Sequence, residues 1–181
     1  MVEKDKRAIF LDRDGTIIYD RGYLRDLEQV QLVPGVGEAL SQLRKEGFYL
    51  VLVSNQSGIG RGLMMLEDLG RVHRQLVALL AEHGVYLDGT YYCPHAPWEG
   101  CACRKPLPGM LLQASEELGI SLARSYMVGD KSTDIEAGKR AGCQTILFGT
   151  GFSVPGVTPD YLAANWADVL QHVLGCSKEK K

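Results

Sequence analysis

Two aspartates separated by one residue, Asp12 and Asp14, stand directly after the apolar run 8–11, in the sequence Asp-Arg-Asp-Gly-Thr. One carboxylate of such a pair can attack phosphorus and form an aspartyl-phosphate, which splits the hydrolysis of a phosphate ester into two easier steps. The second can protonate the leaving oxygen and later deprotonate water. Ordinary turns also contain Asp and Gly, so the pair alone does not establish a catalytic site. We predict that Asp12 is the nucleophile and Asp14 the general acid and base.

Three more polar residues could act on the same phosphoryl group. Ser54 and Asn55 follow the apolar run 49–53 and offer a hydroxyl and an amide to phosphoryl oxygens, although such residues are also common in turns and helix caps. Lys105 lies between a cysteine cluster and a proline, and would place a positive charge against the transferring group. We predict that Ser54 and Lys105 stabilise the phosphoryl group.

A third acidic position, Asp130, follows another apolar run, 126–128. Two or three oxygens from the turns at Asp12, Asp14 and Asp130, together with water, suit the hard cation Mg²⁺. Such an ion would bridge to the phosphate and neutralise developing negative charge. The sequence therefore predicts a catalytic magnesium site formed by these three residues.

Strand-like and helix-like segments alternate along the chain, which predicts a doubly wound, mainly parallel α/β sheet with helices on both faces. In such sheets ligands bind beyond the carboxyl ends of the strands, where the polar residues described above would meet. The whole chain, 1–181, is predicted to be one domain with an irregular flap over about 17–33. The expected strands are 8–11, 49–53, 89–93, 125–128 and 144–148, and the expected helices are 34–47, 66–83, 108–118 and 133–141.

A compact group of cysteine and histidine residues lies before Lys105. Cys93, His95, Cys101 and Cys103 offer three thiolates and one imidazole, a closed tetrahedral set of the kind found in structural zinc sites. Disulfides or free thiols are the alternatives, but the chain has 5 cysteines, an odd number. We predict a structural zinc loop over about 93–103 that fixes the direction of the cations following it.

Taken together, these motifs resemble the haloacid dehalogenase (HAD) superfamily of aspartate-nucleophile phosphatases. The resemblance rests on residues 10–16, Ser54-Asn55, Lys105 and Gly129-Asp130, and so spans nearly the whole chain in the family's order. For Asp134 the resemblance leaves two roles open. It could contact the metal ligands without touching the metal itself, or it could simply be an acidic residue in the first turn of a helix. No stretch between the motifs is long enough for the separate cap domain that many members carry. The flap and the zinc loop would then exclude water and contact the substrate.

The zinc loop narrows the resemblance to the family of heptose 1,7-bisphosphate 7-phosphatases, through residues 11–16, 54–58, 91–95, 103–106 and 127–131. That resemblance implies removal of the C7 phosphate of D-glycero-D-manno-heptose 1,7-bisphosphate, in the synthesis of nucleotide-activated heptose for lipopolysaccharide or surface glycans. A histidinol-phosphate phosphatase and an inactive zinc-stabilised binding module remain alternatives. The residues implied to contact the substrate are Asp20, Arg21, Gly22, Tyr23, Asn55, Gln56, Ser57, Arg104 and Lys131.

The composition of the chain mainly excludes certain partners and locations. The formal net charge of -2 gives no reason to expect a nucleic acid partner, and no apolar run approaches the roughly 20 residues that span a bilayer. The charged segment 1–7 does not have the pattern of a signal peptide. We expect a cytoplasmic enzyme that acts on a small sugar bisphosphate, binds neither nucleic acid nor membrane, and is monomeric.

Overall fold

The computed structural model describes residues 5–150 and 156–178, and within them one parallel sheet of six strands in the order β3-β2-β1-β4-β5-β6. The chain builds β1, β2 and β3 in one direction and then returns to the other side of β1 for β4, β5 and β6. The sheet therefore has its topological switch point between β1 and β4. The strands are β1 (Arg7–Leu11), β2 (Phe48–Asn55), β3 (Gly89–Cys93), β4 (Tyr126–Gly129), β5 (Gln144–Phe148) and β6 (Tyr161–Ala163).

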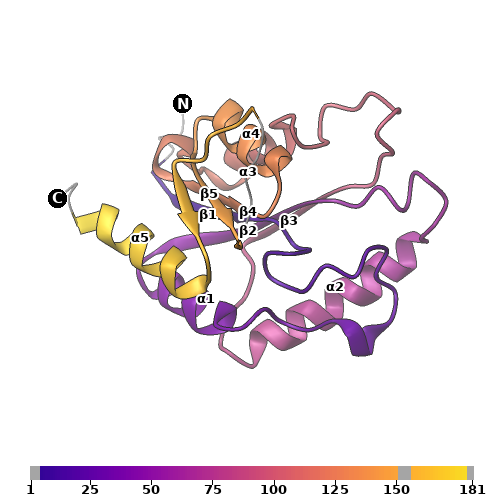
Figure 1. Ribbon diagram of the computed structural model, residues 1–181, viewed down its shortest axis with the longest axis horizontal. Coiled ribbons are helices and arrows are strands. Elements are labelled where there is room, and N and C mark those ends of the chain that lie inside the picture. Colours follow the sequence, from indigo (N-terminus) through magenta and orange to yellow (C-terminus); the bar gives the residue numbers. More distant parts are fainter. Residues whose placement is uncertain (1–4, 151–155, 179–181) are drawn as a thin grey trace.

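Helices cover both faces of this sheet, as Figure 1 shows. One face carries α1 (Val36–Lys45), α2 (Leu66–Ala81) and α5 (Trp166–Lys178), and the other carries α3 (Gly109–Leu118) and α4 (Ser132–Ala141). Two short 3-10 helices, η1 (Leu27–Gln29) and η2 (Leu122–Arg124), lie in connecting segments.

Strand β1 shows why the apolar runs are continuous rather than alternating. Ile9 and Leu11 pack into the core beneath α1, α2 and α5, whereas Ala8 and Phe10 pack into the core beneath α3 and α4. All four side chains are fully buried. A strand covered on both faces needs apolar residues at every position, and this pattern is what predicted the parallel sheet.

The predicted fold class is confirmed, and each predicted strand and helix occurs within about two residues of its expected bounds. The sequence did not predict β6 and α5. The segment between β5 and β6 contains several Gly and Pro residues, which interrupt the alternation of strand-like and helix-like segments.

The segment predicted as an irregular flap is anchored at both ends. Ile17 and Ile18 are fully buried, and Val33 N donates a hydrogen bond to Ile17 O at 2.8 Å. Its middle part, residues 19–23, is exposed. The core therefore holds both ends of this segment and leaves its middle part at the surface.

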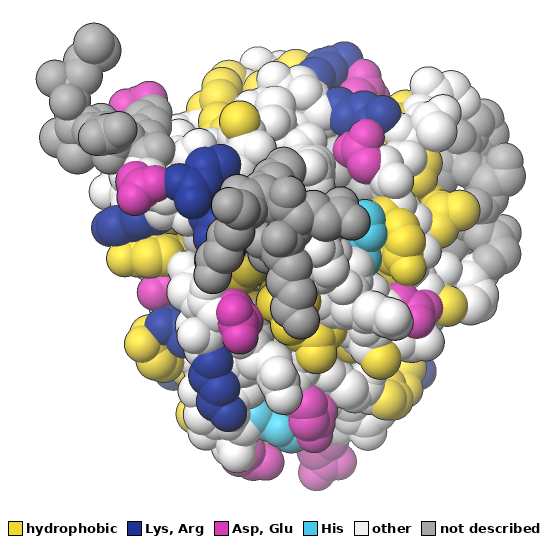
Figure 2. Space-filling model, turned by 90° about the vertical axis from the view of Figure 1, so that its left-hand side faces the viewer, with side chains coloured by type: hydrophobic (Ala, Val, Ile, Leu, Met, Phe, Trp, Pro, Cys, Tyr) yellow, Lys and Arg dark blue, Asp and Glu magenta, His cyan; other side chains and the backbone are white. Residues whose placement is uncertain are grey.

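The surface has mixed character on the face that Figure 2 shows, where acidic, basic and apolar side chains of the described residues are interspersed.

Among the described residues there is no helix long and apolar enough to cross a membrane.

Candidate active site

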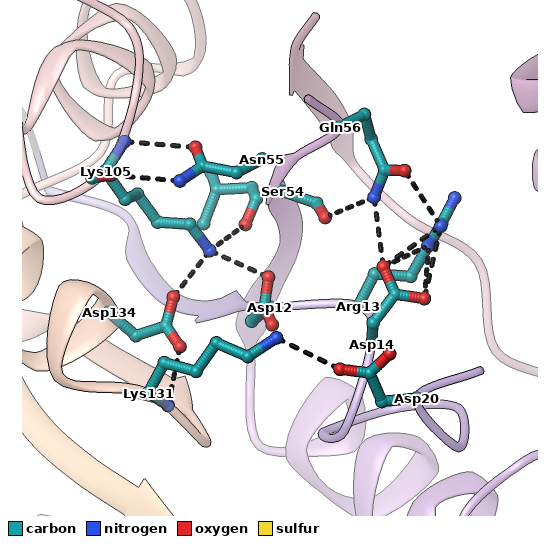
Figure 3. Close-up of polar contacts among 11 residues, drawn as sticks. Asp12, Arg13, Asp14, Asp20, Ser54, Asn55, Gln56, Lys105, Lys131 and Asp134 are labelled. Atoms are coloured by element: carbon teal, nitrogen blue, oxygen red, sulfur yellow. Dashed lines mark hydrogen bonds and ion pairs between the residues drawn. The ribbon is translucent and has the colours of Figure 1, made fainter. Parts of the chain in front are cut away.

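The predicted polar residues meet at the carboxyl edge of the sheet, around the switch point. Asp12 follows β1, Ser54 lies near the end of β2, and Asp130 follows β4. The backbone N–H of Asp12 donates to Val128 O at 3.0 Å, which joins the ends of β1 and β4. Lys105 reaches the same place from the loop between β3 and α3 (Figure 3).

Lys105 lies between two carboxylates. Its Nζ is 2.7 Å from Asp12 Oδ1 and 2.6 Å from Asp134 Oδ1, and it donates to Val53 O at 2.8 Å. The side chain is only 2% exposed. Burial favours the neutral amine, but the charges of Asp12 and Asp134 outweigh it and raise the pKa of Lys105, so the group stays protonated. The site thus holds a fixed cation against the predicted nucleophile.

The carboxylate of Asp14 points away from Lys105. Arg13 and Gln56 hold it, with Gln56 Nε2 donating to Asp14 Oδ2 at 3.0 Å and to Ser54 Oγ at 2.9 Å. Burial raises the pKa of Asp14 although the positive charge of Arg13 opposes the shift.

Three acidic side chains form a cluster beside Lys105. One oxygen each of Asp12, Asp130 and Asp134 lies within 4.8 Å of the others. Burial, and then the charges of Asp12 and Asp134, raise the pKa of Asp130 to about 7. Its Oδ1 is buried and has no hydrogen-bond partner among the described residues. A partly buried carboxylate with a free oxygen and acidic neighbours has the donor set that Mg²⁺ takes.

One member of the predicted magnesium set, Asp14, differs from Asp12 and Asp130. The Asp14 carboxylate is not part of the acidic cluster that Asp12, Asp130 and Asp134 form. Asp134 uses both of its oxygens, one with Lys105 Nζ and the other accepting from Lys131 N at 3.0 Å. It lies in the first turn of α4 and caps the helix. Both roles left open for Asp134 are thus compatible with its position.

Asn55 does not point freely into the site. Its amide oxygen accepts from Lys105 N at 3.0 Å, and its amide nitrogen donates to Lys105 O at 2.9 Å. The end of β2 therefore holds the backbone of Lys105 directly. The side-chain amide of Asn55, which was predicted to bind substrate, is therefore occupied by the backbone of Lys105.

Two polar hollows meet at the site. Three residues line both hollows: Asp14, Asn55 and Lys131. The first hollow is completed by Asp12, Ser54, Lys105, Thr133 and Asp134, and the second by Asp20, Gly22, Tyr23, Gln56, Ser57 and Gly58. The first gathers the predicted phosphoryl-binding groups, and the second contains most of the predicted substrate contacts.

An ion pair crosses from the exposed segment 19–23 to the start of α4. Lys131 Nζ lies 3.1 Å from Asp20 Oδ2 (Figure 3). Arg21 and Arg104, which were also predicted to contact substrate, do not line either hollow. Arg21 lies over the ring of Tyr19, and Arg104 Nη1 donates to His95 O at 3.3 Å. The structure thus gathers most, but not all, of the predicted substrate contacts.

The predicted zinc ligands converge. Cys93 Sγ lies 3.6 Å from both His95 Nδ1 and Cys101 Sγ, and His95 Nδ1 lies 3.3 Å from Cys103 Sγ. Ligand atoms around a tetrahedral zinc ion are about 3.4–3.8 Å apart, whereas a disulfide needs sulfurs about 2 Å apart. The four groups therefore fit a zinc ion. The loop is joined to the active site because Gln56 N donates to Cys93 O at 2.7 Å.

Comparison with known proteins supplies the family. A family model described as HAD-hydrolase-like matches residues 102–174. The chain is 47% identical, over 88% of each sequence, to the D-glycero-beta-D-manno-heptose-1,7-bisphosphate 7-phosphatase of Yersinia pestis. The Escherichia coli K12 enzyme of the same name is 44% identical over 91% of this chain and 88% of its own.

This chain belongs to the heptose-bisphosphate phosphatase family of HAD-like hydrolases. A solved relative, the D,D-heptose 1,7-bisphosphate phosphatase of B. bronchiseptica complexed with magnesium and phosphate, superposes with a TM-score of 0.83. It is 33% identical, and the match covers 94% of this chain and 99% of the relative. The superfamily and family predicted from the motifs are confirmed.

Two residues of this heptose-bisphosphate phosphatase fold support the site but were not predicted. Arg13 is fully buried beside Asp14. Trp166, at the start of α5, donates from Nε1 to Thr16 O at 3.0 Å and so anchors the turn that follows β1. The position of Arg13 between two aspartates could have drawn attention to it. Nothing near Trp166 in the sequence indicates its contact, which joins residues 150 positions apart.

Proposed function

We propose that this protein hydrolyses the C7 phosphate of D-glycero-D-manno-heptose 1,7-bisphosphate and so serves the synthesis of nucleotide-activated heptose. The observation that carries the proposal is the pairing of Asp12 with Lys105 at the switch point, in a chain similar over most of its length to phosphatases of that name. The inactive-module alternative is disfavoured because Asp12, Asp14, Ser54 and Lys105 all line one hollow.

In the first step, an Asp12 oxygen attacks phosphorus and the bond between phosphorus and the C7 oxygen breaks. Asp14, at the junction of the two hollows, gives its proton to the departing sugar oxygen. Lys105 and the hydroxyl of Ser54 would balance the charge on the phosphoryl oxygens. The products of this step are heptose 1-phosphate and an aspartyl-phosphate on Asp12.

In the second step, water attacks the phosphorus of the aspartyl-phosphate. Asp14, now a carboxylate, accepts a proton from that water and regains its starting state. The bond between phosphorus and the Asp12 oxygen breaks, which releases inorganic phosphate and the Asp12 carboxylate. Arg13 and Gln56 keep the Asp14 carboxylate in place between the two steps.

The carboxylates of Asp12 and Asp130, with the backbone carbonyl of Asp14, are proposed to hold Mg²⁺. The unpartnered oxygen of Asp130 supports this assignment. When bound, Mg²⁺ neutralises charge on the phosphoryl group and helps to orient it. Cys93, His95, Cys101 and Cys103 are proposed to hold a structural Zn²⁺.

The second hollow is proposed to receive the sugar. Asp20, Gly22, Tyr23 and Ser57 line it and offer backbone and side-chain groups to hydroxyls. Lys131 borders both hollows and is well placed to contact the substrate near the transferred phosphate. The sequence-based assignments of Arg21 and Arg104 as substrate contacts, the monomeric state and the cytoplasmic location remain predictions.

A substrate panel tests the proposal. Purified protein with Mg²⁺ is supplied with heptose 1,7-bisphosphate or histidinol phosphate, and products are followed by ³¹P NMR. The expected result is loss of the C7 phosphate resonance, retention of the C1 phosphate, and turnover of histidinol phosphate at least about 100-fold less efficient. Preferential hydrolysis of histidinol phosphate would contradict the proposed substrate.

The matched control is Asp12→Asn. It is expected to lose all measurable turnover while keeping its circular dichroism spectrum, because the amide cannot attack phosphorus.

A further inference from the structure

Arg13 lies between the two active-site aspartates and is fully buried. Its Nε lies 3.2 Å from each oxygen of the Asp14 carboxylate, and its Nη2 lies 3.1 and 3.0 Å from the same two oxygens. A planar guanidinium that binds both oxygens fixes the orientation of a carboxylate as well as its position.

Gln56 completes this arrangement. Its Oε1 accepts from Arg13 Nη2 at 3.0 Å, while its Nε2 donates to Asp14 Oδ2 at 3.0 Å and to Ser54 Oγ at 2.9 Å. Figure 3 shows the three side chains in one connected set. The carboxylate is therefore held by a guanidinium and an amide that also hold each other.

Stability alone does not account for a buried arginine here. Nη1 of Arg13 has no hydrogen-bond partner among the described residues, and Tyr92 is a further polar neighbour of the guanidinium, with its ring centre 5.9 Å from the guanidinium carbon. Removing a guanidinium from water is costly, and a buried donor without a partner adds to the cost. A residue kept under these conditions calls for a functional explanation.

The location of Asp14 supplies that explanation. Asp14 lines both hollows and so lies between the proposed phosphoryl site and the proposed sugar site. Misplacing a catalytic group by about 1 Å can slow the reaction about 100-fold. We propose that Arg13 is a positioning residue, which holds the Asp14 carboxyl group in the orientation that protonates the leaving oxygen. This inference rests on the function proposed above.

A purely structural role for Arg13 makes a different prediction. A disturbed site would slow phosphoryl transfer from every substrate alike. A misplaced general acid slows only those substrates whose leaving oxygen needs a proton, because a leaving group of low pKa departs as an anion. The comparison of two leaving groups therefore separates the two roles.

The experiment measures kcat/KM of the Mg²⁺-loaded protein for heptose 1,7-bisphosphate and for 4-nitrophenyl phosphate. This parameter includes steps only through departure of the leaving group, so it reports the first proton transfer and not the second. Arg13→Met is expected to lower kcat/KM about 100-fold for the sugar and less than about 3-fold for the aryl ester. Equal losses on both substrates overturn the proposal.

Asp14→Asn provides the reference. It is expected to show the same preference for the aryl ester, and its failure to do so would count against the acid role of Asp14 itself, and hence against the proposed mechanism. If Asp14→Asn shows the preference and Arg13→Met does not, only the inference about Arg13 fails.

A double variant tests whether Arg13 acts through Asp14. If it does, Arg13→Met adds less than about 3-fold to the loss that Asp14→Asn already causes on the sugar substrate, whereas independent roles would multiply. Folding of each variant is followed by thermal melting. Should Arg13→Met fail to fold, Arg13→Lys carries the same comparison, since it keeps the buried charge but lacks the planar fork. If the fold-losses of the two single variants multiply in the double variant, the proposal is contradicted.

Discussion

The side-chain amide of Asn55 forms two hydrogen bonds with the backbone of Lys105, accepting from its N–H at 3.0 Å and donating to its carbonyl at 2.9 Å. Asn55 ends β2, and Lys105 follows the zinc loop two residues after Cys103. The contact therefore joins the sheet edge to the loop that carries the site's buried cation. Lys105 owes its position to this contact as well as to its two carboxylate partners.

Replacing Asn55 should impair catalysis through Lys105. We expect Asn55→Ala to lower kcat about 10- to 100-fold, because a shift of about 1 Å in a charged group can cost that much. Asn55→Asp is the matched control for shape. It keeps the acceptor for Lys105 N but places a second acceptor against Lys105 O, and should lose activity to a similar extent. Steady-state kinetics on heptose 1,7-bisphosphate give kcat for the two variants. A wild-type kcat in both variants would refute the claim that Asn55 acts on catalysis through Lys105.

Loss of the zinc site should affect both stability and activity. Cys103→Ser is expected to remove bound zinc and about 2–3 kcal/mol of stability, which lowers Tm by about 5–10 °C in a domain of this size. Activity should also fall, because the loop leads directly to Lys105. Metal analysis and thermal melting provide the measurements.

Cys143 supplies the control for the zinc prediction. It is a buried thiol that packs in the core beneath α3 and α4, outside the zinc loop. Cys143→Ala should keep full zinc content. Zinc-free wild-type protein, purified without chelators, would show that the Cys/His cluster is not a zinc site.

Magnesium binding should weaken as the pH falls. In the metal-free protein, burial and the neighbouring carboxylates of Asp12 and Asp134 raise the pKa of Asp130 to about 7. The folded protein then binds a proton more tightly than the unfolded chain, so ionisation of Asp130 costs stability as the pH rises from about 4 to about 7. Mg²⁺ relieves that cost by replacing the proton. The apparent Kd for Mg²⁺ should rise up to about tenfold per pH unit below 7.

Thermal shift at several pH values checks this dependence. The increase in Tm caused by Mg²⁺ should be larger at pH 8 than at pH 6, and Asp130→Asn should show little increase at either pH. An equal Tm increase at both pH values in the wild-type protein would contradict the assignment of Asp130 as a ligand.

The parts of the structure that were predicted from sequence are those encoded by local pattern. Runs such as 8–11 and 49–53 are apolar at nearly every position because both sheet faces are covered, and this pattern predicted the sheet and the edge where the site lies. The four zinc ligands lie within 11 positions of one another, so their convergence needs little information from the rest of the fold.

Contacts that depend on distant packing were not predicted. The amide of Asn55 was assigned to substrate because its residue type suits a phosphoryl oxygen, but Lys105, 50 positions away, takes it. The hydrogen bond from Trp166 to Thr16 likewise depends on where α5 packs. Residue type indicates what a side chain can bind, whereas the tertiary structure determines which partner it meets.

The central claim is that Asp12 is phosphorylated during turnover. Heptose 1,7-bisphosphate carrying ³²P at C7 is mixed with excess enzyme and Mg²⁺ and quenched in acid within milliseconds. The trapped acyl phosphate is then reduced with borohydride and located by peptide mass spectrometry. The account predicts transient labelling of the protein and homoserine in place of Asp12. Labelling of a different residue, or steady release of labelled phosphate with no labelled protein at any quench time, would contradict it.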